Sequence, residues 1–274
     1  QSLFQETVRR FSGEGFLPPL IIGGAAHLPL IDAQLAEIGV TPDAVIIEPM
    51  PRNTAAVAAV ASAWAGRAGD QRLVLLTPAD HHVADAAAFR RDVLRGAAAA
   101  AKGSIVTFGI RPTEPHTGFG YVETGAGIVD RVFEVAGFRE KPDRATAERY
   151  VAGGRHFWNA GVFLFSPGAM DAELHAYAPA IRKSAANALA AAARSGAALT
   201  LDPAIFAECP SDSIDYAVME KTRRAAVVAP VDAGWSDIGS WTALDALPGD
   251  PRVAAIECGA NIIRSDGPLI AAIG

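Results

Sequence analysis

Two aspartates that lie far apart in the chain have local settings suited to a divalent metal ion. Asp80 follows an apolar run, residues 73–76, that predicts a buried strand, and open α/β sheets bind ligands just beyond the carboxyl ends of their strands. Asp237 lies between Gly234 and Gly239, which indicates a tight loop. Mg²⁺ prefers one or two carboxylates together with substrate phosphates. The alternative is purely structural: Asp80 caps the following helix, and Asp237 makes an ordinary Asx-turn.

Residues 48–54 form a proline-stiffened segment between a predicted strand and a predicted helix. Arg52 offers a planar fork of donors, and Asn53 and Thr54 carry side chains that bond a base edge or cap a helix. The segment therefore predicts nucleotide recognition. Plain helix capping beside a solvated arginine is the alternative.

Glu140 and Lys141 end another predicted strand, directly before Pro142. The proline predicts an extended conformation for Lys141 and a strand that turns away at this point. A carboxylate acceptor for sugar hydroxyls beside an ammonium for phosphate would suit the mouth of a binding site. A solvated strand end would use the same residues.

Asn159 interrupts an otherwise apolar strand at residues 157–165. Burying an unpaired amide costs roughly 1–3 kcal/mol, so this side chain needs a partner. A bound ligand and a neighbouring backbone group are both able to supply one.

Composition narrows the class of protein. Half of the 274 residues are hydrophobic, enough for a large core, and the formal net charge of −6 comes without a basic cluster, which argues against a nucleic-acid partner. No apolar run approaches the ~20 residues that span a bilayer, so no membrane partner is predicted. Cys209 and Cys258 form no CxxC pair, and the adjacent His81 and His82 have no further histidine at ligand spacing. A cytoplasmic location fits these features best.

Strand and helix patterns alternate up to about residue 109, which predicts an α/β fold with a doubly wound, mixed and mostly parallel sheet. Strands are expected at 19–23, 44–47, 73–76 and 104–108, and helices at 1–11, 27–38, 53–66 and 85–102. Further along, the patterns predict antiparallel or mixed strands at 118–123, 131–140 and 157–165, and helices at 169–195 and 203–221. Short strands and turns at 253–273 predict a small C-terminal β appendage.

Seven short segments follow one another along nearly the whole chain: EPMPRNTA (48–55), PADH (78–81), HTGFGY (116–121), FREKP (138–142), WNAG (158–161), SDSIDYAVMEK (211–221) and GWSDIGSW (234–241). In this order they resemble the sugar-1-phosphate nucleotidyltransferases. The run at 213–221 resembles the bacterial mannose-1-phosphate guanylyltransferase branch, which occurs alone or fused to a phosphomannose isomerase.

The resemblance implies a Rossmann-like nucleotidyltransferase domain at residues 1–247 and the start of a C-terminal β extension at 248–274. It also leads us to expect the family's first strand and glycine-rich phosphate loop ahead of residue 1.

The activity that the resemblance implies is transfer of GMP from GTP to mannose 1-phosphate, giving GDP-mannose and pyrophosphate. The sugar-phosphate oxygen would attack the α-phosphorus in line, so catalysis would rest on positioning and charge neutralisation. Mg²⁺ is the implied cofactor, held by Asp80 and Asp237, and a homodimer is compatible with the resemblance. The alternatives are a non-catalytic regulatory homologue that binds sugar nucleotides, or an enzyme with another sugar or base.

The resemblance also assigns the remaining site residues. Lys141 would neutralise the sugar phosphate and complete the catalytic set with Asp80 and Asp237. The mannose hydroxyls would be read by Glu140 and Asn159, and Gly118 would let the backbone approach the sugar where a side chain would intrude. The nucleotide pocket would be lined by Arg52, Asn53 and Thr54, with Glu48 behind them.

Overall fold

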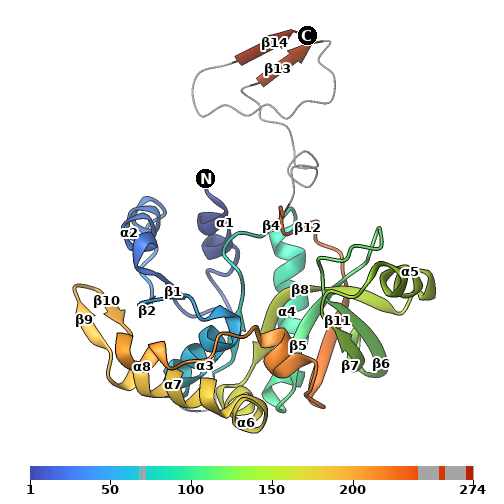
Figure 1. Ribbon diagram of the computed structural model, residues 1–274. Coiled ribbons are helices and arrows are strands. Elements are labelled where there is room, and N and C mark those ends of the chain that lie inside the picture. Colours follow the sequence, from blue (N-terminus) through green and yellow to red (C-terminus); the bar gives the residue numbers. More distant parts are fainter. Residues whose placement is uncertain (68, 70–71, 240–252, 257–269, 274) are drawn as a thin grey trace.

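The computed structural model describes residues 1–67, 69, 72–239, 253–256 and 270–273 (Figure 1). Its first elements are α1 (Leu3–Arg10), β1 (Leu20–Gly24), a 3-10 turn (Ala25–His27), α2 (Leu28–Glu37), β2 (Ala44–Glu48), α3 (Asn53–Gly66), β3 (Val74–Leu76), β4 (His82–Val83), α4 (Ala86–Ala101) and β5 (Ile105–Ile110). They are followed by β6 (Tyr121–Val129), β7 (Val132–Arg139), α5 (Arg144–Gly153), β8 (His156–Phe165), α6 (Pro167–Tyr177), α7 (Pro179–Ala190), β9 (Ala193–Ser195), β10 (Ala198–Thr200), α8 (Pro203–Ala207), a π-helical turn (Asp215–Met219), β11 (Ala225–Val231) and β12 (Trp235–Ser236).

The first sheet has the strand order β1-β2-β10-β9. β1 pairs with β2 in parallel, so that Gly24 lies opposite Glu48, and β10 pairs in parallel with the other edge of β2. The residues of β2 from Ala44 to Ile47 are buried because both faces of the strand are covered: Ile46 packs into one apolar cluster, and Val45 and Ile47 pack into another. Glu48 therefore lies at the carboxyl end of a central strand, as the sequence predicted.

The second sheet has the order β3-β8-β5-β11-β7-β6 and mixes parallel with antiparallel pairs. β11 runs parallel to β5, whereas β8 is antiparallel to both β3 and β5 and separates them. A run as apolar as that of β8 is suited to a position buried on both faces, and Val162, Phe163 and Phe165 are among its buried residues. The mixed α/β fold is confirmed, and hydrophobic periodicity did not reveal where β8 inserts.

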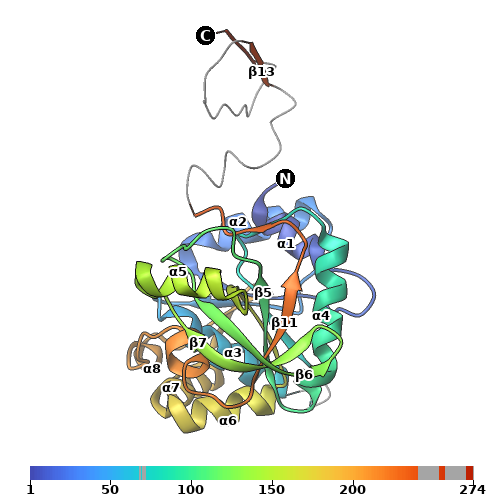
Figure 2. The same cartoon turned by 90° about the vertical axis from the view of Figure 1, so that its right-hand side faces the viewer.

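Helices cover the sheets and bury small side chains (Figures 1 and 2). α3 packs against α6 and α7 at the bottom of the view in Figure 1, and Ala55, Ala56 and Ala58 are fully buried there. α4 packs against β11, β5 and β8. None of the helices in the described part of the chain is both long and apolar enough to cross a membrane.

The two long helices expected at 169–195 and 203–221 were wrong. The first is divided into α6 and α7, with β9 beyond them, and the second into α8 and the separate π-helical turn. Pro179 and Pro210 explain the two breaks, because proline cannot donate a backbone hydrogen bond and disfavours helix in the residue before it.

Near the C-terminus, β13 (Val253–Ile256) and β14 (Ile270–Ile273) pair in parallel and provide the strands of the expected β appendage. Residues 240–252 and 257–269 lie outside the described part of the chain, and so does Trp241 of the last motif. The boundary between residues 247 and 248 stays a prediction.

The contact between β5 and β8 generates a stability prediction at Gly109, which lies opposite Asn159. A Cβ at Gly109 would lie 2.9 Å from Phe157 Cβ and 3.0 Å from Ala229 Cβ, neither of which can rotate away. We expect Gly109→Ala to lower the free energy of unfolding by about 1–3 kcal/mol, measured by urea denaturation. The control is Gly127→Ala in β6, where no atom lies within 4 Å of the added methyl group. Equal stabilities of the two variants would contradict this packing.

Candidate active site

A two-residue antiparallel ladder brings the segments of Asp80 and Asp237 together. In this ladder Val83 of β4 lies opposite Trp235 of β12, and His82 lies opposite Ser236. Antiparallel strands run in opposite directions, so residues preceding His82 and following Ser236 emerge at the same end. Asp80 and Asp237 therefore both lie beyond the same end of the ladder, and a shared metal site there stays a prediction.

His81 connects the two segments of the ladder through Trp235, and its imidazole is close enough to Asp80 and Asp237 for both charges to act on it. Its Nδ1 accepts a hydrogen bond from Trp235 Nε1 at 3.2 Å, and the two rings meet edge to face. Burial lowers the pKa of His81, while Asp80 and Asp237 both oppose that shift. The buried guanidinium of Arg10, from α1, donates to the His81 carbonyl at 3.1 Å. Together these contacts fix the turn that carries Asp80.

The Asp237 loop is tight and backbone-bonded. Asp237 Oδ1 accepts the Gly239 amide at 3.1 Å, and Ser236 Oγ accepts the Ile238 amide at 3.1 Å. A Cβ at Gly239 would lie 2.8 Å from Asp237 Oδ2, so a larger residue there would displace the Asp237 carboxylate. Ile238 has φ +50°, an unusual value for a β-branched residue, and such strained positions often occur at functional sites.

The structural alternatives for the two aspartates have different outcomes. Asp237 makes the Asx-turn that was considered, in addition to its position at the ladder. The helix after Asp80, however, is capped by Asp85, whose Oδ1 accepts the Ala88 amide at 2.8 Å. The helix-capping alternative for Asp80 is therefore wrong.

Glu140 and Lys141 follow β7 and form a charged pair. Lys141 Nζ lies 3.6 Å from Glu140 Oε1, and the Glu140 amide donates to Glu220 Oε1 at 3.0 Å. Burial, with Asp215 as the next contribution, raises the pKa of Glu140 to about 7. The expected extended conformation of Lys141 was wrong, because its φ is +45°. The hydrogen bond from the Glu140 amide to Glu220 holds the preceding residue, so this tertiary contact shapes the turn together with Pro142.

Asn159 is 8% exposed, and its amide is satisfied by protein groups. Thr107 Oγ1 donates to Asn159 Oδ1 at 2.6 Å, and the Gly161 amide donates to the same oxygen at 3.2 Å. Asn159 Nδ2 donates to Asp215 Oδ1 at 2.9 Å. The sequence left a bound ligand and a neighbouring backbone group open as partners of this amide. In the structure its partners are the Gly161 backbone and two side chains, Thr107 and Asp215.

Two glycines shape the space next to these side chains. Gly118 lies against His116, whose Nδ1 accepts the Gly118 amide, and a Cβ there would lie 2.8 Å from His116 Cε1. A Cβ at Gly120 would collide with Glu140 Oε2 and lie 3.4 Å from Asn159 Cβ. The glycine that makes room for Glu140 and Asn159 is thus Gly120, which the sequence interpretation overlooked although it lies in the same motif.

The predicted nucleotide segment is fixed by α8 and the 212–215 segment. Arg52 donates to the Phe206 and Ala207 carbonyls at 3.4 and 2.6 Å, so its guanidinium holds the end of α8. Asn53 has φ +63° and accepts the Thr54 amide through its own Oδ1. Thr54 Oγ1 accepts the Ile214 amide at 2.9 Å. A role for these residues in nucleotide binding stays a prediction.

Glu48 has the least satisfied side chain of this group. Its Oε1 is buried and has no hydrogen-bond partner among the described residues. Burial raises the pKa of Glu48 to about 7. A buried carboxyl oxygen without a partner is costly, and a bound donor would remove that cost.

The His81 turn and the Asn159 side chain both lie next to Gly161 of β8. A Cβ at Gly161 would lie 3.7 Å from His81 Cε1, and the Gly161 amide already bonds Asn159. Phe119 adds a second connection, because its ring contacts both Trp158 of β8 and Trp235 of β12 at centroid distances of 5.0 and 5.7 Å. The segments around Asp80, Asp237 and Asn159 therefore border one region.

The acidic residues fit a metal that also has ligands from a substrate. No group of three or more His, Cys, Asp or Glu side chains suited to a metal occurs in the part of the chain that the structure describes. Asp80 and Asp237, which leave the β4–β12 ladder at the same end, would offer two carboxylates, the kind of donor set that Mg²⁺ uses together with phosphate oxygens and water, and this metal site stays a prediction.

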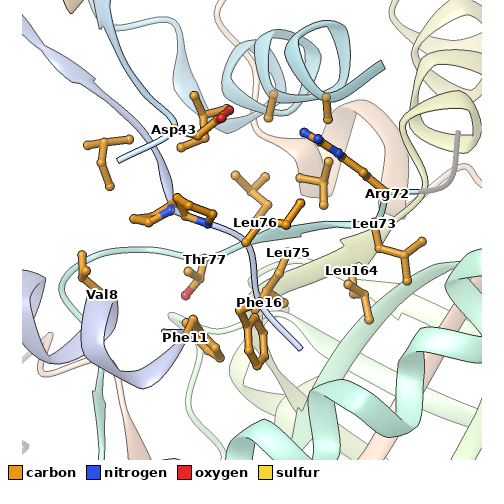
Figure 3. A pocket seen from close by; sticks show the side chains of 18 of the residues that line it. Val8, Phe11, Phe16, Asp43, Arg72, Leu73, Leu75, Leu76, Thr77 and Leu164 are labelled. Carbon is orange, nitrogen blue, oxygen red and sulfur yellow. The ribbon is translucent and has the colours of Figure 1, made fainter. Parts of the chain in front are cut away.

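A cavity of about 560 Å³ separates β1 from β3 (Figure 3). Within the described residues β1 pairs only with β2, and β3 only with β8, so each strand turns an open edge toward the other. The apolar residues of both strands line this cavity, and Figure 3 shows Leu75 and Leu76 with Phe11 and Phe16 around it. The cavity is thus a gap between the two sheets.

Comparison with known proteins identifies relatives over most of the chain. Xanthan biosynthesis protein XanB of Xanthomonas campestris pv. campestris is 45% identical over 243 residues, which are 89% of this chain and 51% of that protein. The mannose-1-phosphate guanylyltransferase of Klebsiella pneumoniae is 39% identical over 284 residues, covering 100% of this chain and 60% of the relative. The chain thus spans about half the length of the first of these relatives.

A solved structure and a family model agree with these relatives. The crystal structure described as mannose-1-phosphate geranyltransferase from Thermus thermophilus superposes with a TM-score of 0.83 at 29% identity, covering 100% of this chain and 80% of that one. The family model for nucleotidyl transferases matches residues 1–247. This match includes the segments of every predicted site residue, and the chain belongs to the nucleotidyl transferase family.

Proposed function

We propose that the protein transfers GMP from GTP to mannose 1-phosphate and releases GDP-mannose and pyrophosphate. The observation that carries this proposal is the β4–β12 ladder, which sends Asp80 and Asp237 out on one side, next to the segment that holds Asn159. The name of the Klebsiella relative, a mannose-1-phosphate guanylyltransferase, supports the choice of sugar and base.

The chemistry requires positioning and charge neutralisation, with no covalent intermediate. An oxygen of mannose 1-phosphate attacks the α-phosphorus of GTP, one P–O bond forms, and the bond to the leaving pyrophosphate breaks. Asp80 and Asp237 would hold Mg²⁺, which supplies positive charge to the phosphates when bound. The rigid loops of these two aspartates keep the carboxylates in place, so little reorganisation accompanies the reaction.

On the sugar side, Lys141 would neutralise the phosphate of mannose 1-phosphate, while Glu140 and Asn159 bind hydroxyl groups. With a pKa of about 7, Glu140 exists in both protonation states near neutral pH. It is therefore able to accept or donate a hydrogen bond to a hydroxyl. Gly120 supports this role because it leaves room for the Glu140 carboxyl group.

On the nucleotide side, Glu48 supports the choice of GTP. Guanine carries an exocyclic amino group that donates hydrogen bonds, and the buried Oε1 of Glu48 needs a donor. Arg52, Asn53 and Thr54 would form the wall of this pocket, with Arg52 acting through its bonds to the end of α8. We place the protein in the cytoplasm, where reduced cysteines are the rule.

We also propose that an additional strand fills the cavity between β1 and β3. Both strands are apolar, half-buried and open along the edge that faces the cavity, so one inserted strand would complete two ladders and join the two sheets.

The activity is tested by measuring pyrophosphate release with Mg²⁺ across a panel of nucleoside triphosphates and the 1-phosphates of mannose, glucose and galactose. We expect the highest kcat/KM for GTP with mannose 1-phosphate, and loss of activity when EDTA removes the metal. Binding of GDP-mannose without pyrophosphate release from any pair would favour the regulatory homologue. A different preferred pair would correct the sugar or the base.

The metal carboxylates are tested by Asp80→Asn and Asp237→Asn. Each is expected to lower kcat at least ~10²-fold, the loss typical of removing a preorganised charge, and to need more Mg²⁺ for half-maximal rate. Asp232→Asn is the control, because Asp232 is an exposed residue between β11 and β12. Wild-type kcat in either active-site variant would remove that residue from the mechanism.

The additional strand is tested by amide hydrogen exchange in the natural protein and in a recombinant chain limited to residues 1–274. We expect the amides of β1 and β3 that face the cavity to exchange slowly in the natural protein and quickly in the recombinant chain, since a filled cavity bonds and buries them. Fast exchange of these amides in both proteins would show that no strand inserts.

A further inference from the structure

We propose that Asp215 is a positioning residue of the sugar subsite, which fixes the orientation of the Asn159 amide and contributes to the charge around Glu140. This proposal rests on the proposed function for the identity of the ligand, a hexose 1-phosphate. Asp215 lies in the SIDYAVMEK run, but no residue-level pattern in that run indicated a place for it in the site.

The hydrogen bonds around Asn159 allow only one orientation of its amide. Oδ1 receives donors from Thr107 and from the Gly161 backbone, and Nδ2 donates to the Asp215 carboxylate. In the reversed orientation, the amide oxygen would face the Asp215 carboxylate and the amino group would face the Gly161 N–H, so both contacts would be repulsive. The second N–H of Asn159 Nδ2 makes no hydrogen bond to the described residues and would be available to donate to a ligand hydroxyl.

The segment that carries Asp215 is bonded to α3, which begins with two of the predicted nucleotide-binding residues. Asp215 opens the π-helical turn directly after Ile214, whose amide donates to Thr54 Oγ1 at 2.9 Å. The Asp212 carbonyl accepts the Ala55 amide at 3.1 Å, which ties the same segment to the first turn of α3. Single π-helical turns occur frequently at functional sites. Residues 212–215 thus contact α3 at one end and Asn159 at the other.

Asp215 also belongs to a group of charges at Glu140. In the described part of the chain, the charged groups that act on Glu140 are Asp215, Lys141 and Glu220. Burial raises the pKa of Asp215, while its hydrogen bond from Asn159 and the Lys141 ammonium counteract that rise. Because Asp215 raises the pKa of Glu140, its replacement by a neutral amide should lower that pKa.

The test compares Asp215→Asn with wild type in steady-state kinetics on both substrates. We expect KM for mannose 1-phosphate to rise at least ~10-fold and KM for GTP to change less than ~2-fold, since a misplaced amide affects the sugar subsite first. The pH midpoint of kcat/KM that reports Glu140 should move to lower pH. Asp202→Asn is the control: Asp202 caps α8, asparagine is an equally good cap, and neither KM nor the midpoint should change.

A second variant guards against a purely structural effect. Thr107→Val removes the donor to Asn159 Oδ1 without touching Asp215, so it should raise KM for mannose 1-phosphate while leaving the pH midpoint unchanged. Because both variants disturb one amide, the double variant should show less than the product of the two single effects. Equal changes in both KM values, or a pH midpoint that does not move in Asp215→Asn, would overturn the proposal.

A readout without catalysis separates this proposal from the proposed function. If the wild-type protein transfers no nucleotide to any sugar phosphate, the proposed function fails, and the orientation of Asn159 is then tested by NMR. We expect the side-chain NH₂ signals of Asn159 to be shifted and slowly exchanging in wild type and in Asp202→Asn, and to lose both properties in Asp215→Asn. Unchanged signals in Asp215→Asn would overturn the positioning role even in an active enzyme.

Discussion

The short ladder between β4 and β12 is the interaction on which the arrangement of the site depends. It joins segments 154 residues apart at the His81–Trp235 hydrogen bond, and it decides that Asp80 and Asp237 emerge together. Two rungs are a weak ladder in isolation, so the surrounding contacts matter. Arg10 donates a hydrogen bond to the His81 carbonyl, and the Phe119 ring contacts the Trp235 ring edge to face. Arg10 of α1 and Phe119 of the loop before β6 therefore stabilise this contact, together with backbone hydrogen bonds from Ala84 and Asp85 to residues 233–234.

An unusual backbone conformation recurs in three of the predicted site segments, those of residues 48–55, 138–142 and 234–241. Among the described residues, the non-glycine residues with positive φ are Asn53, Arg131, Lys141 and Ile238, and all but Arg131 lie in these segments. Such conformations cost on the order of 1–3 kcal/mol each and persist only where the surroundings enforce them. Three of these four strained residues, Asn53, Lys141 and Ile238, lie beside or among the charged residues predicted for the site. Fixed positions of charged groups are what a reaction that relies on preorganisation requires.

The sequence predicted the features that depend on local pattern. Alternation of strands and helices predicted the α/β fold, which is confirmed. Strand ends, proline-stiffened turns and glycines led to the prediction of Asp80, Glu140, Asn159 and Asp237 as site residues, and their roles stay predictions. The sequence did not predict the position of β8 between β3 and β5, because an apolar run does not specify its neighbours or their direction. It also did not reveal that Arg52 bonds α8, or that Asp215 pairs with Asn159, because such partners are distant in the chain.

The segment at residues 212–215 has a thermodynamic consequence, because it contacts α3 at the predicted nucleotide side and Asn159 at the sugar side. A ligand that binds better to one position of this segment favours that position for a second ligand at the other end. Such coupling is reciprocal: the factor by which a nucleotide tightens sugar-phosphate binding equals the factor by which the sugar phosphate tightens nucleotide binding. Through this short segment, each substrate would slow the loss of the other from the site, and the two affinities would rise by the same factor.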